Sequence, residues 1–370
     1  MSPLSYKDKL KTIDVKKHWY TYGLVLCAML LSNCAKNNVH IEDIPEKTAS
    51  REMPISFICS FVDNAVTRHA NELCKHAPTM GVWGWRTGSH ETDTPVFINQ
   101  QVVHNEDSAR WEYAPLQYWR EGCSYCFCAY APHQQDTECD ISIDSDTHMI
   151  SIKNVTLHGH NLQSTPSSSL QELFRDTPDT DWMIARGGQT VETGTNMDIE
   201  FMMQHILGKL NICIKGAETI LSRPCLTSIT VDSMVVSKLP SQGDFTQQLT
   251  HTPILNNPDE VAIEEWAVHA SDLTIKCKQP CTLATTPTYL VESLVIPHHM
   301  DDATTLKLYY TYHFTDGTSE QCRYRMPLTK AFSRFVSGYN HTLTFTICAN
   351  RIVFETGTIG WKEDNDVNNN

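Results

Sequence analysis

Short runs of β-branched and aromatic residues, broken by Pro, Gly, Asn or Asp, recur along most of the chain. Apolar and polar positions alternate in several of them, which is typical of strands with one buried face. No long helical stripe separates the runs, so the pattern predicts an all-β fold of β-sandwich type. The predicted strands are Ile55–Val62, Met80–Trp85, Ser124–Ala131, Met149–Val155, Leu210–Ile214, Ser228–Val236, Thr304–Phe314, Thr342–Cys348 and Ile352–Thr356.

One segment, Met197–Leu210, fits two patterns. Its apolar residues Ile199, Met202 and Ile206 fall near a helical stripe, which favours the start of a helix. The same residues also fit two strands around a kink. The hydrophobic pattern alone leaves both interpretations open.

The first 34 residues have the layout of a bacterial lipoprotein signal. A lysine-rich leader precedes the apolar segment Tyr20–Leu31, and Cys34 follows it. That segment has 12 residues, whereas a membrane-spanning helix needs about 20. We therefore expect residues 1–33 to be removed and Cys34 to carry the lipid. Asn33 stands where a small residue is usual, so an uncleaved anchor, or Cys34 as an ordinary thiol, is the alternative.

Length and composition suggest how the chain after residue 33 is divided into domains. We expect a polar tether at 34–53, an N-terminal β-sandwich domain at 54–214, a C-terminal one at 215–363 and a polar tail at 364–370. Removing residues 1–33 takes away five lysines and two aspartates, so the formal net charge goes from -14 to -17. Such an acidic body, without clustered Lys or Arg, argues against nucleic acid as a partner.

Cysteines and histidines were the first candidates for chemistry. Twelve of the 14 cysteines lie beyond Cys34, and Cys277 with Cys281 is the best local candidate for a disulfide. Cys126 and Cys128 fall on one face of a predicted strand and Phe127 on the other, so they are poorly placed to bond each other. Most of these cysteines are therefore interpreted as buried thiols.

Two histidine pairs could ligate a metal. They are His158 with His160 and His298 with His299, but no carboxylate or cysteine stands at a spacing that completes either site. We therefore predict no metal and no cofactor. His205 is interpreted as a hydrogen-bonded structural histidine.

An enzyme is the least favoured class. The chain has no Gly-rich phosphate loop, no Gly-x-Ser-x-Gly elbow and no His-Glu-x-x-His helix. A hydrolase would need paired acids across a cleft. Glu264 and Glu265 before Trp266 are instead interpreted as a solvated turn, so no catalytic residue is predicted.

Aromatic residues supply two competing interpretations. Trp111, Tyr113, Tyr118, Trp119, Tyr125 and Phe127 lie in or beside strand-like runs. They favour packing between sheets, because each ring can bury about 150 to 250 Å². The alternative is a surface lipoprotein whose aromatic platform binds glycans. The two differ in whether Trp83, Trp85, Trp111 and Trp119 are buried.

A set of motifs follows in order along the chain: Pro95–Val103, Trp111–Pro115, Tyr118–Trp119, Tyr125–Pro132, Phe201–His205, Leu207–Leu210, Leu294–Pro297, Gly338–Ile347, Ile352 and Trp361. In this order they resemble the fimbrillin family, whose members build type V pili of Bacteroidota. The match extends from about residue 54 to residue 361 and includes the lipoprotein-like leader. After Leu294–Pro297 the chain departs from the family's Ile-Pro-Gln element, since His298 replaces the glutamine.

The resemblance implies two tandem transthyretin-like β-sandwich domains in a fimbrial structural or accessory subunit. It also implies a lipid anchor in the outer membrane, adhesion at the cell surface, and assembly with other fimbrial subunits by donor-strand exchange. In such proteins, cleavage after an arginine removes the first strand. Arg51 precedes the predicted strand Ile55–Val62 and Arg68 follows it, so both are candidate cleavage sites.

Overall fold

The chain divides into two compact units, residues 1–51 and residues 52–370, and the described residues all belong to the second unit. Cys34, Arg51 and Arg68 lie outside them. The computed structural model describes residues 53–61, 77–88, 93–134, 140–144, 147, 149–159, 161–162, 179–185, 191–192, 198–248, 264–269, 272–277 and 280–360.

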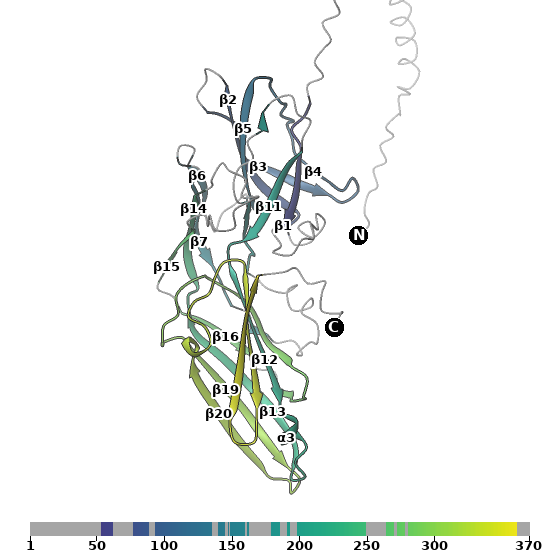
Figure 1. Cartoon of the computed structure of the whole chain (residues 1–370), viewed down its shortest axis with the longest axis vertical. Helices are drawn as coiled ribbons and strands as arrows, with labels where there is room; N and C mark the ends of the chain where they lie inside the picture. Colours follow the sequence, from purple (N-terminus) through teal and green to yellow (C-terminus); the bar gives the residue numbers. More distant parts are fainter. Residues whose placement is uncertain are drawn as a thin grey trace, which may run out of the picture. The chain divides into compact units, whose positions relative to one another are not determined.

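Strands dominate the described residues, so the all-β prediction is confirmed (Figure 1). Within these ranges the helical elements are one turn of α-helix, α3 (Glu218–Leu221), and the 3-10 turn η4 (Leu328–Lys330). Across the same part of the chain, no helix has the length and apolar character needed to span a membrane.

The first sheet begins at one edge with the strand nearest the N-terminus. Among its described strands, β1 and β11 are parallel and the other pairings are antiparallel. A short strand, β10 (Val191–Glu192), also pairs with β5. In spatial order the other strands are β1 (Phe57–Phe61), β11 (Ile199–His205), β9 (Met183–Ala185), β5 (Cys123–Ala131), β2 (Thr79–Gly88), β3 (Thr94–Asn105) and β4 (Arg110–Glu112).

The second sheet joins segments that are distant in the sequence. Its order is β15 (Glu264–Val268), β14 (Gln242–Gln248), β7 (Met149–Thr156) and β6 (Asp140–Asp144). The antiparallel pairing of β7 with β14 links the chain before residue 214 to the chain after it. The boundary between the two expected domains stays a prediction, as does their transthyretin-like type.

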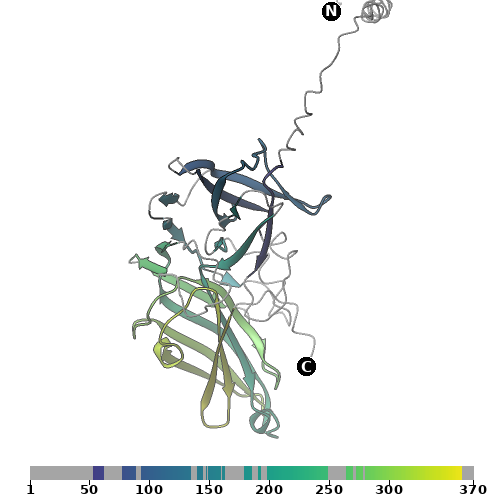
Figure 2. The same cartoon turned by 45° about the horizontal axis from the view of Figure 1, so that its top comes forward.

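The third and fourth sheets pack face to face. Figure 2 shows the yellow and green C-terminal strands together with teal strands from the middle of the chain. Tyr324 and Phe345 bridge the sheets, with ring centroids 6.1 Å apart. The third sheet has the order β20 (Ser319–Pro327), β19 (Thr305–Phe314), β13 (Leu226–Leu239), β16 (Leu273–Cys277) and β8 (Asn161–Leu162), with β17 (Cys281–Thr282) on β13; the fourth has β18 (Thr288–Val295), β12 (Gly208–Gly216), β21 (Tyr339–Ile347) and β22 (Ile352–Gly360).

The segment that fitted two patterns forms two strands. β11 and β12 flank a kink at Ile206 and Leu207, and β11 alternates buried and half-buried residues. The helical alternative is wrong, because Phe57–Phe61 and Met183–Ala185 both pair with β11 and satisfy its backbone polar groups. Tertiary pairing overrides the local stripe.

Buried side chains form two clusters, and β5 contributes to both. Tyr125 and Phe127 join a cluster on one face of the first sheet. Cys128 and Tyr130 face the other cluster, which continues into the remaining sheets. The predicted separation of Phe127 from Cys128 by strand alternation is confirmed.

Candidate functional site

The first candidate site is the slot that β1 fills at the edge of the first sheet. Of the described strands, only β11 pairs with β1, in the register Phe57–Ile199 to Phe61–Met203. The Ile199 N–H donates to the Ser56 carbonyl oxygen at 2.8 Å. One side of β1 is thus bonded to the sheet along its length.

The residues before β1 are held by a second set of bonds, from the loop that follows β4. The Ile55 N–H donates to the Gln117 carbonyl oxygen at 2.9 Å, and the Trp119 N–H donates to the Met53 carbonyl oxygen at 3.1 Å. The Tyr113 hydroxyl donates to the Ile55 carbonyl oxygen at 2.7 Å. Burial raises the pKa of Tyr113 to about 12, so its hydroxyl keeps the proton that it donates.

Alternate side chains of this segment enter the core. Ile55, Phe57 and Cys59 are 1%, 3% and 2% exposed, whereas Ile58 is 43% exposed. Four rings surround Phe57, and we call them the Phe57 pocket. Their centroids lie at 5.5 Å (Phe97), 5.6 Å (Tyr113), 6.0 Å (Phe127) and 5.5 Å (Phe201) from that of Phe57. An edge strand that supplies core side chains is a structural part of the first sheet.

At the edge of the fourth sheet, β22 differs from the edge strand β20 of the third sheet. Among the described strands only β21 pairs with it. Its residues from Glu355 to Ile359 are exposed, and it contains no Lys, Arg or Pro. The edge strand β20, in contrast, carries Arg323, Arg325 and Pro327, which discourage edge pairing.

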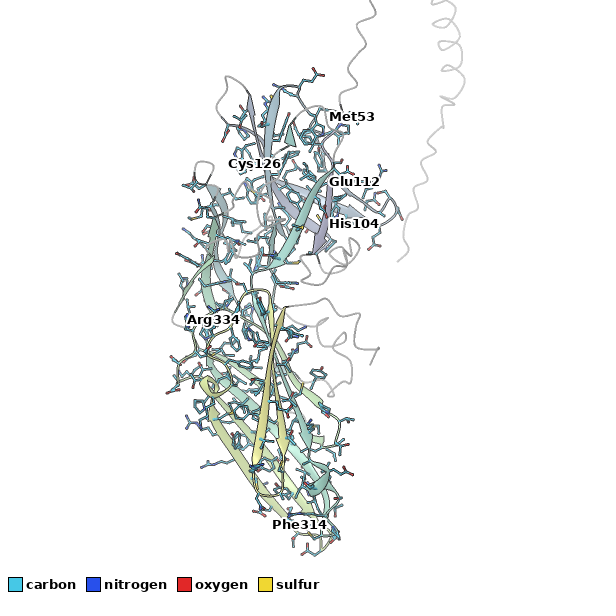
Figure 3. All side chains as sticks on the ribbon, in the orientation of Figure 1. Met53, His104, Glu112, Cys126, Phe314 and Arg334 are labelled. Atoms are coloured by element: carbon cyan, nitrogen blue, oxygen red, sulfur yellow. The ribbon has the colours of Figure 1, made fainter. Side chains whose placement is uncertain are left out.

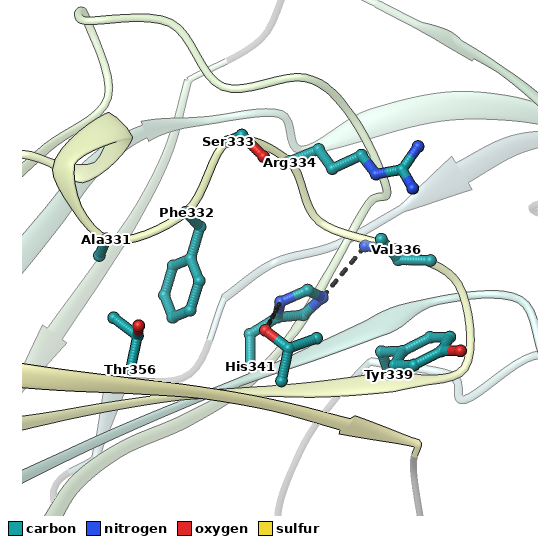
Figure 4. Close-up of a pocket in the computed structure, with 9 residues that line it drawn as sticks. Ala331, Phe332, Ser333, Arg334, Val336, Tyr339, His341 and Thr356 are labelled. Atoms are coloured by element: carbon teal, nitrogen blue, oxygen red, sulfur yellow. Dashed lines mark hydrogen bonds between the residues drawn. The ribbon is translucent and has the colours of Figure 1, made fainter. Parts of the chain in front are cut away.

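A second candidate site is a cavity of about 420 Å³ between the 331–336 loop and the β21–β22 hairpin. Figure 4 shows Phe332 and His341 beneath the loop, with Arg334 extending from it. The Met300 N–H donates to the Ser333 carbonyl oxygen at 2.9 Å, which helps to fix the loop. The two candidate sites are at different sheets, the first and the fourth, and the labels at Met53 and Arg334 lie far apart in Figure 3.

His341 forms part of the cavity wall and is almost fully buried. The Val336 N–H donates to its Nε2 at 3.1 Å, and its Nδ1 lies 3.3 Å from the Thr358 hydroxyl oxygen. Burial lowers the pKa of His341 to about 4. The ring is therefore neutral near pH 7, with its proton assigned to Nδ1 because Nε2 accepts a bond.

The burial of four tryptophans distinguishes the two interpretations of the aromatic residues, packing between sheets and a glycan-binding platform. Trp83, Trp85 and Trp111 are buried. Trp119 is half-buried and packs edge-on against Tyr125, with centroids 4.7 Å apart. The core-packing prediction is confirmed for these tryptophans, which present no exposed aromatic pair on a sheet face, but it is wrong for Tyr118, which is 41% exposed.

The histidines predicted as doubtful ligands have other partners. His158 lies 3.2 Å from Asp179, and His160 is outside the described residues. His298 Nδ1 lies 2.7 Å from the Ile296 carbonyl oxygen, and burial lowers the pKa of His298. Within the described ranges, no group of three His, Cys, Asp or Glu side chains could hold a metal ion.

His205 is the structural histidine that the sequence predicts. It is buried, and its Nδ1 lies 3.0 Å from a carboxylate oxygen of Asp181. The Glu264–Glu265 prediction is wrong, since both residues start strand β15 and pair with β14. Trp266 explains the difference, because it packs on Phe245 at 5.2 Å and draws the segment into the sheet.

The cysteines fit the interpretation as buried thiols in several places. Burial raises the pKa of Cys213 to about 12 and that of Cys281 to about 11. Cys277 and Cys281 pair with different residues of β13, Met234 and Val231. Cys281 is a thiol, so these two described residues do not form the local disulfide.

Sequence reasoning missed the cavity entirely. Arg334 and Thr358 are single polar residues in unremarkable runs, and His341 lay in a motif valued only for its resemblance. They meet because His341 pairs with Thr358 across the β21–β22 hairpin. A local hydrophobic pattern carries no signal of that meeting.

Sheets, buried aromatics and the edge slot together define an all-β sandwich protein whose first strand lies at a sheet edge. Comparison with known proteins identifies its family. A family model described as fimbrillin-like matches residues 67–361. The chain therefore belongs to the fimbrillin-like family.

One solved structure shares the fold at low sequence identity, and a second is similar over most of its length. A fimbrial protein from Bacteroides vulgatus is 16% identical, with a TM-score of 0.53, and the match covers 84% of this chain and 99% of that one. A proposed cell adhesion protein from Bacteroides ovatus is 16% identical, with a TM-score of 0.49 and coverage of 85% and 99%. No curated protein sequence matches the chain.

Proposed function

We propose that this protein is a fimbrial subunit that is anchored by lipid on export and polymerises by donor-strand exchange. The observation that carries the proposal is β1, an edge strand with backbone bonds to β11. Its side chains Phe57 and Cys59, and Ile55 just before it, lie in the core. Such a strand can be replaced by another of similar pattern, since main-chain bonds supply affinity and alternate side chains supply register.

Release of β1 would activate the subunit. Arg68 follows β1 in the sequence, so cleavage after it separates β1 from the body. Cleavage after Arg51 leaves β1 attached and frees the body only from its tether. Arg68 is therefore the proposed activating site, and Arg51 a site of release from the membrane.

Loss of β1 would leave an acceptor slot. The β11 edge would present unpaired N–H and C=O groups, and the Phe57 pocket would lose its central ring. Both features favour pairing with an incoming strand. The carbonyl oxygens of Gln117 and the hydroxyl of Tyr113 would bond its leading residues.

β22 is the proposed donor strand. It lies at an exposed edge, and its residues Ile352, Phe354 and Thr356 repeat the alternation of Ile55, Phe57 and Cys59. In that register Phe354 would occupy the Phe57 pocket of the next subunit. Because donor and acceptor are different surfaces of one chain, the contact does not close on itself and yields a filament.

The remaining functions follow from this assembly. Cys34 would hold the precursor in the outer membrane, and the filament would act at the cell surface in adhesion, with other fimbrial subunits as partners. Cys34→Ala should shift the protein from the membrane to the soluble fraction. An unmodified Cys34 in membrane-bound protein, detected by mass spectrometry, would contradict the anchor.

The test of strand exchange uses two matched arginines. Arg68→Gln should abolish filaments, because β1 then stays in its slot. Arg51→Gln should leave filaments intact, since cleavage after Arg68 removes the whole N-terminal segment. Electron microscopy of sheared material gives the readout. Normal filaments from the Arg68→Gln strain would contradict the activation step.

A further inference from the structure

The cavity beside β22 has a lining that is rich in hydrogen-bond donors. Arg334 is the only charged residue among the described residues that line it, and none of them is Asp or Glu. In a chain with a formal net charge of -14, this is a local reversal of sign. The lining consists of Ala331, Phe332, Ser333, Arg334, Val336, Tyr339, His341, Thr356 and Thr358.

The hydrogen bonds of His341 leave the Thr358 hydroxyl as a further donor toward the cavity. Since His341 Nε2 accepts from the Val336 N–H, the ring proton is on Nδ1 and donates to the Thr358 oxygen. The proton of the Thr358 hydroxyl then has to be donated elsewhere. Thr358 lines the cavity and is exposed, so that proton is available to a ligand.

Arg334 is also available. It is exposed, and no residue in the described part of the chain forms an ion pair with it. A guanidinium binds a carboxylate with two parallel hydrogen bonds, which gives both affinity and geometry. The charge of the cavity thus suits a single carboxylate.

The walls suit a sugar ring. A volume of about 420 Å³ is within the usual size of small-ligand sites. Phe332 packs on His341 with centroids 5.4 Å apart and forms a rigid apolar wall. Tyr339, at the other end in Figure 4, is 37% exposed and offers an aromatic surface with a polar tip. The Ser333 and Thr356 hydroxyls can bond sugar hydroxyls.

We propose that this cavity binds a hexuronic acid unit of a glycan, with the carboxylate on Arg334 and Thr358 and the ring against Tyr339. The site would make the subunit itself an adhesin for acidic polysaccharides. Every residue that forms it belongs to one chain, but Thr356 and Thr358 are part of β22, so the site is complete only in a subunit whose β22 is still paired with β21.

The test measures binding to the unpolymerised, purified full-length protein. Sodium glucuronate and sodium galacturonate serve as probes in saturation-transfer NMR and calorimetry, with methyl glucoside and sodium acetate for comparison. The uronates should bind in the millimolar range and about tenfold more tightly than either comparison compound. Binding that is equal for methyl glucoside or for acetate would overturn the assignment.

Variants locate the site. Arg334→Gln should weaken uronate binding by about tenfold or more, because a hydrogen-bonded charge pair is lost. Arg334→Lys should retain part of the affinity, and Arg325→Gln, at an exposed position of β20, should bind as the wild type does. Unchanged binding by Arg334→Gln, or no uronate binding by the wild type at millimolar concentrations, would overturn the proposal. Filament formation is not used as a readout, so failure here leaves the proposed assembly intact.

Discussion

The two edge strands β1 and β22 are held in different ways. The segment of β1 places Ile55, Phe57 and Cys59 in the core, and β11 bonds it on one side, while the loop after β4 holds its start. β22 is exposed along most of its length and leaves Phe354 half-buried. The chain therefore has one edge that the core requires and one edge that it hardly uses.

Under the proposed strand exchange, this difference would determine which edge accepts a strand and which edge donates one. A slot that requires an occupant favours any strand that fits, because the unfilled slot exposes apolar surface and unpaired backbone groups. A strand that contributes little to its own domain leaves it at a small cost. In the proposed assembly, this asymmetry would give polymerisation a direction.

The largest effect on stability is expected in the Phe57 pocket, where it tests the difference between the two edge strands. Phe57→Ala should lower the free energy of unfolding of the unprocessed protein by about 3–5 kcal/mol, as for other buried phenylalanines. Ile58→Ala, at an exposed position of the same strand, should change it by less than about 0.5 kcal/mol. Urea denaturation measures both. Equal losses would show that β1 is not anchored by alternate side chains.

Titration of His341 tests how strongly its contact with Thr358 holds β22. The pKa of His341 is about 4 in the folded protein, below the usual 6.5. Well above pH 6.5, His341 is neutral in both the folded and the unfolded protein, so its full contribution to the free energy of unfolding is present. As the pH falls from 6.5 to 4, only the unfolded chain takes up the proton, so stability should fall by at most about 2–3 kcal/mol.

The matched comparison removes the effects of other titrating groups. His341→Gln should lack this part of the decline between pH 6.5 and 4 in urea denaturation curves. Hydrogen exchange should show the loss of protection in β22, whose Thr358 pairs with His341, before any loss in β1. An identical pH profile in the variant would contradict the assignment.

The smallest effect on stability is expected at Phe354. Its ring lies 6.2 Å from that of Phe345, and Phe354→Ala should cost about 1–2 kcal/mol, since the side chain is only half-buried. Filament yield should fall far more than stability, because the donor loses the ring proposed for the Phe57 pocket. Glu355→Ala, on the opposite face of β22, is the control. Normal filaments from Phe354→Ala would exclude β22 as the donor.

The sequence was sufficient for the features that depend on local pattern. Alternation predicted the strand that contains Phe57, and aromatic density predicted the burial of Trp83 and Trp111. The family motifs predicted membership of the fimbrillin family and an all-β architecture. The match to a fimbrillin-like family model confirms the membership, and the observed strands confirm the all-β architecture.

The sequence pattern could not predict features that depend on pairing between distant segments. The parallel pairing of β1 with β11 and the pairing of β7 with β14 join residues about a hundred or more positions apart, and alternation does not specify the partner. The same limit explains Met197–Leu210, where neighbouring strands decided between helix and strand. It also explains the missed cavity, which exists only where the 331–336 loop crosses the β21–β22 hairpin.

The most direct test of the central claim is the N-terminus of subunits in native filaments. Sheared filaments are collected and their subunits sequenced by mass spectrometry. The account predicts that the assembled subunit begins at His69, directly after Arg68, so that β1 is absent. Subunits that begin at Cys34 or at Glu52, and therefore retain Phe57–Phe61, would contradict it.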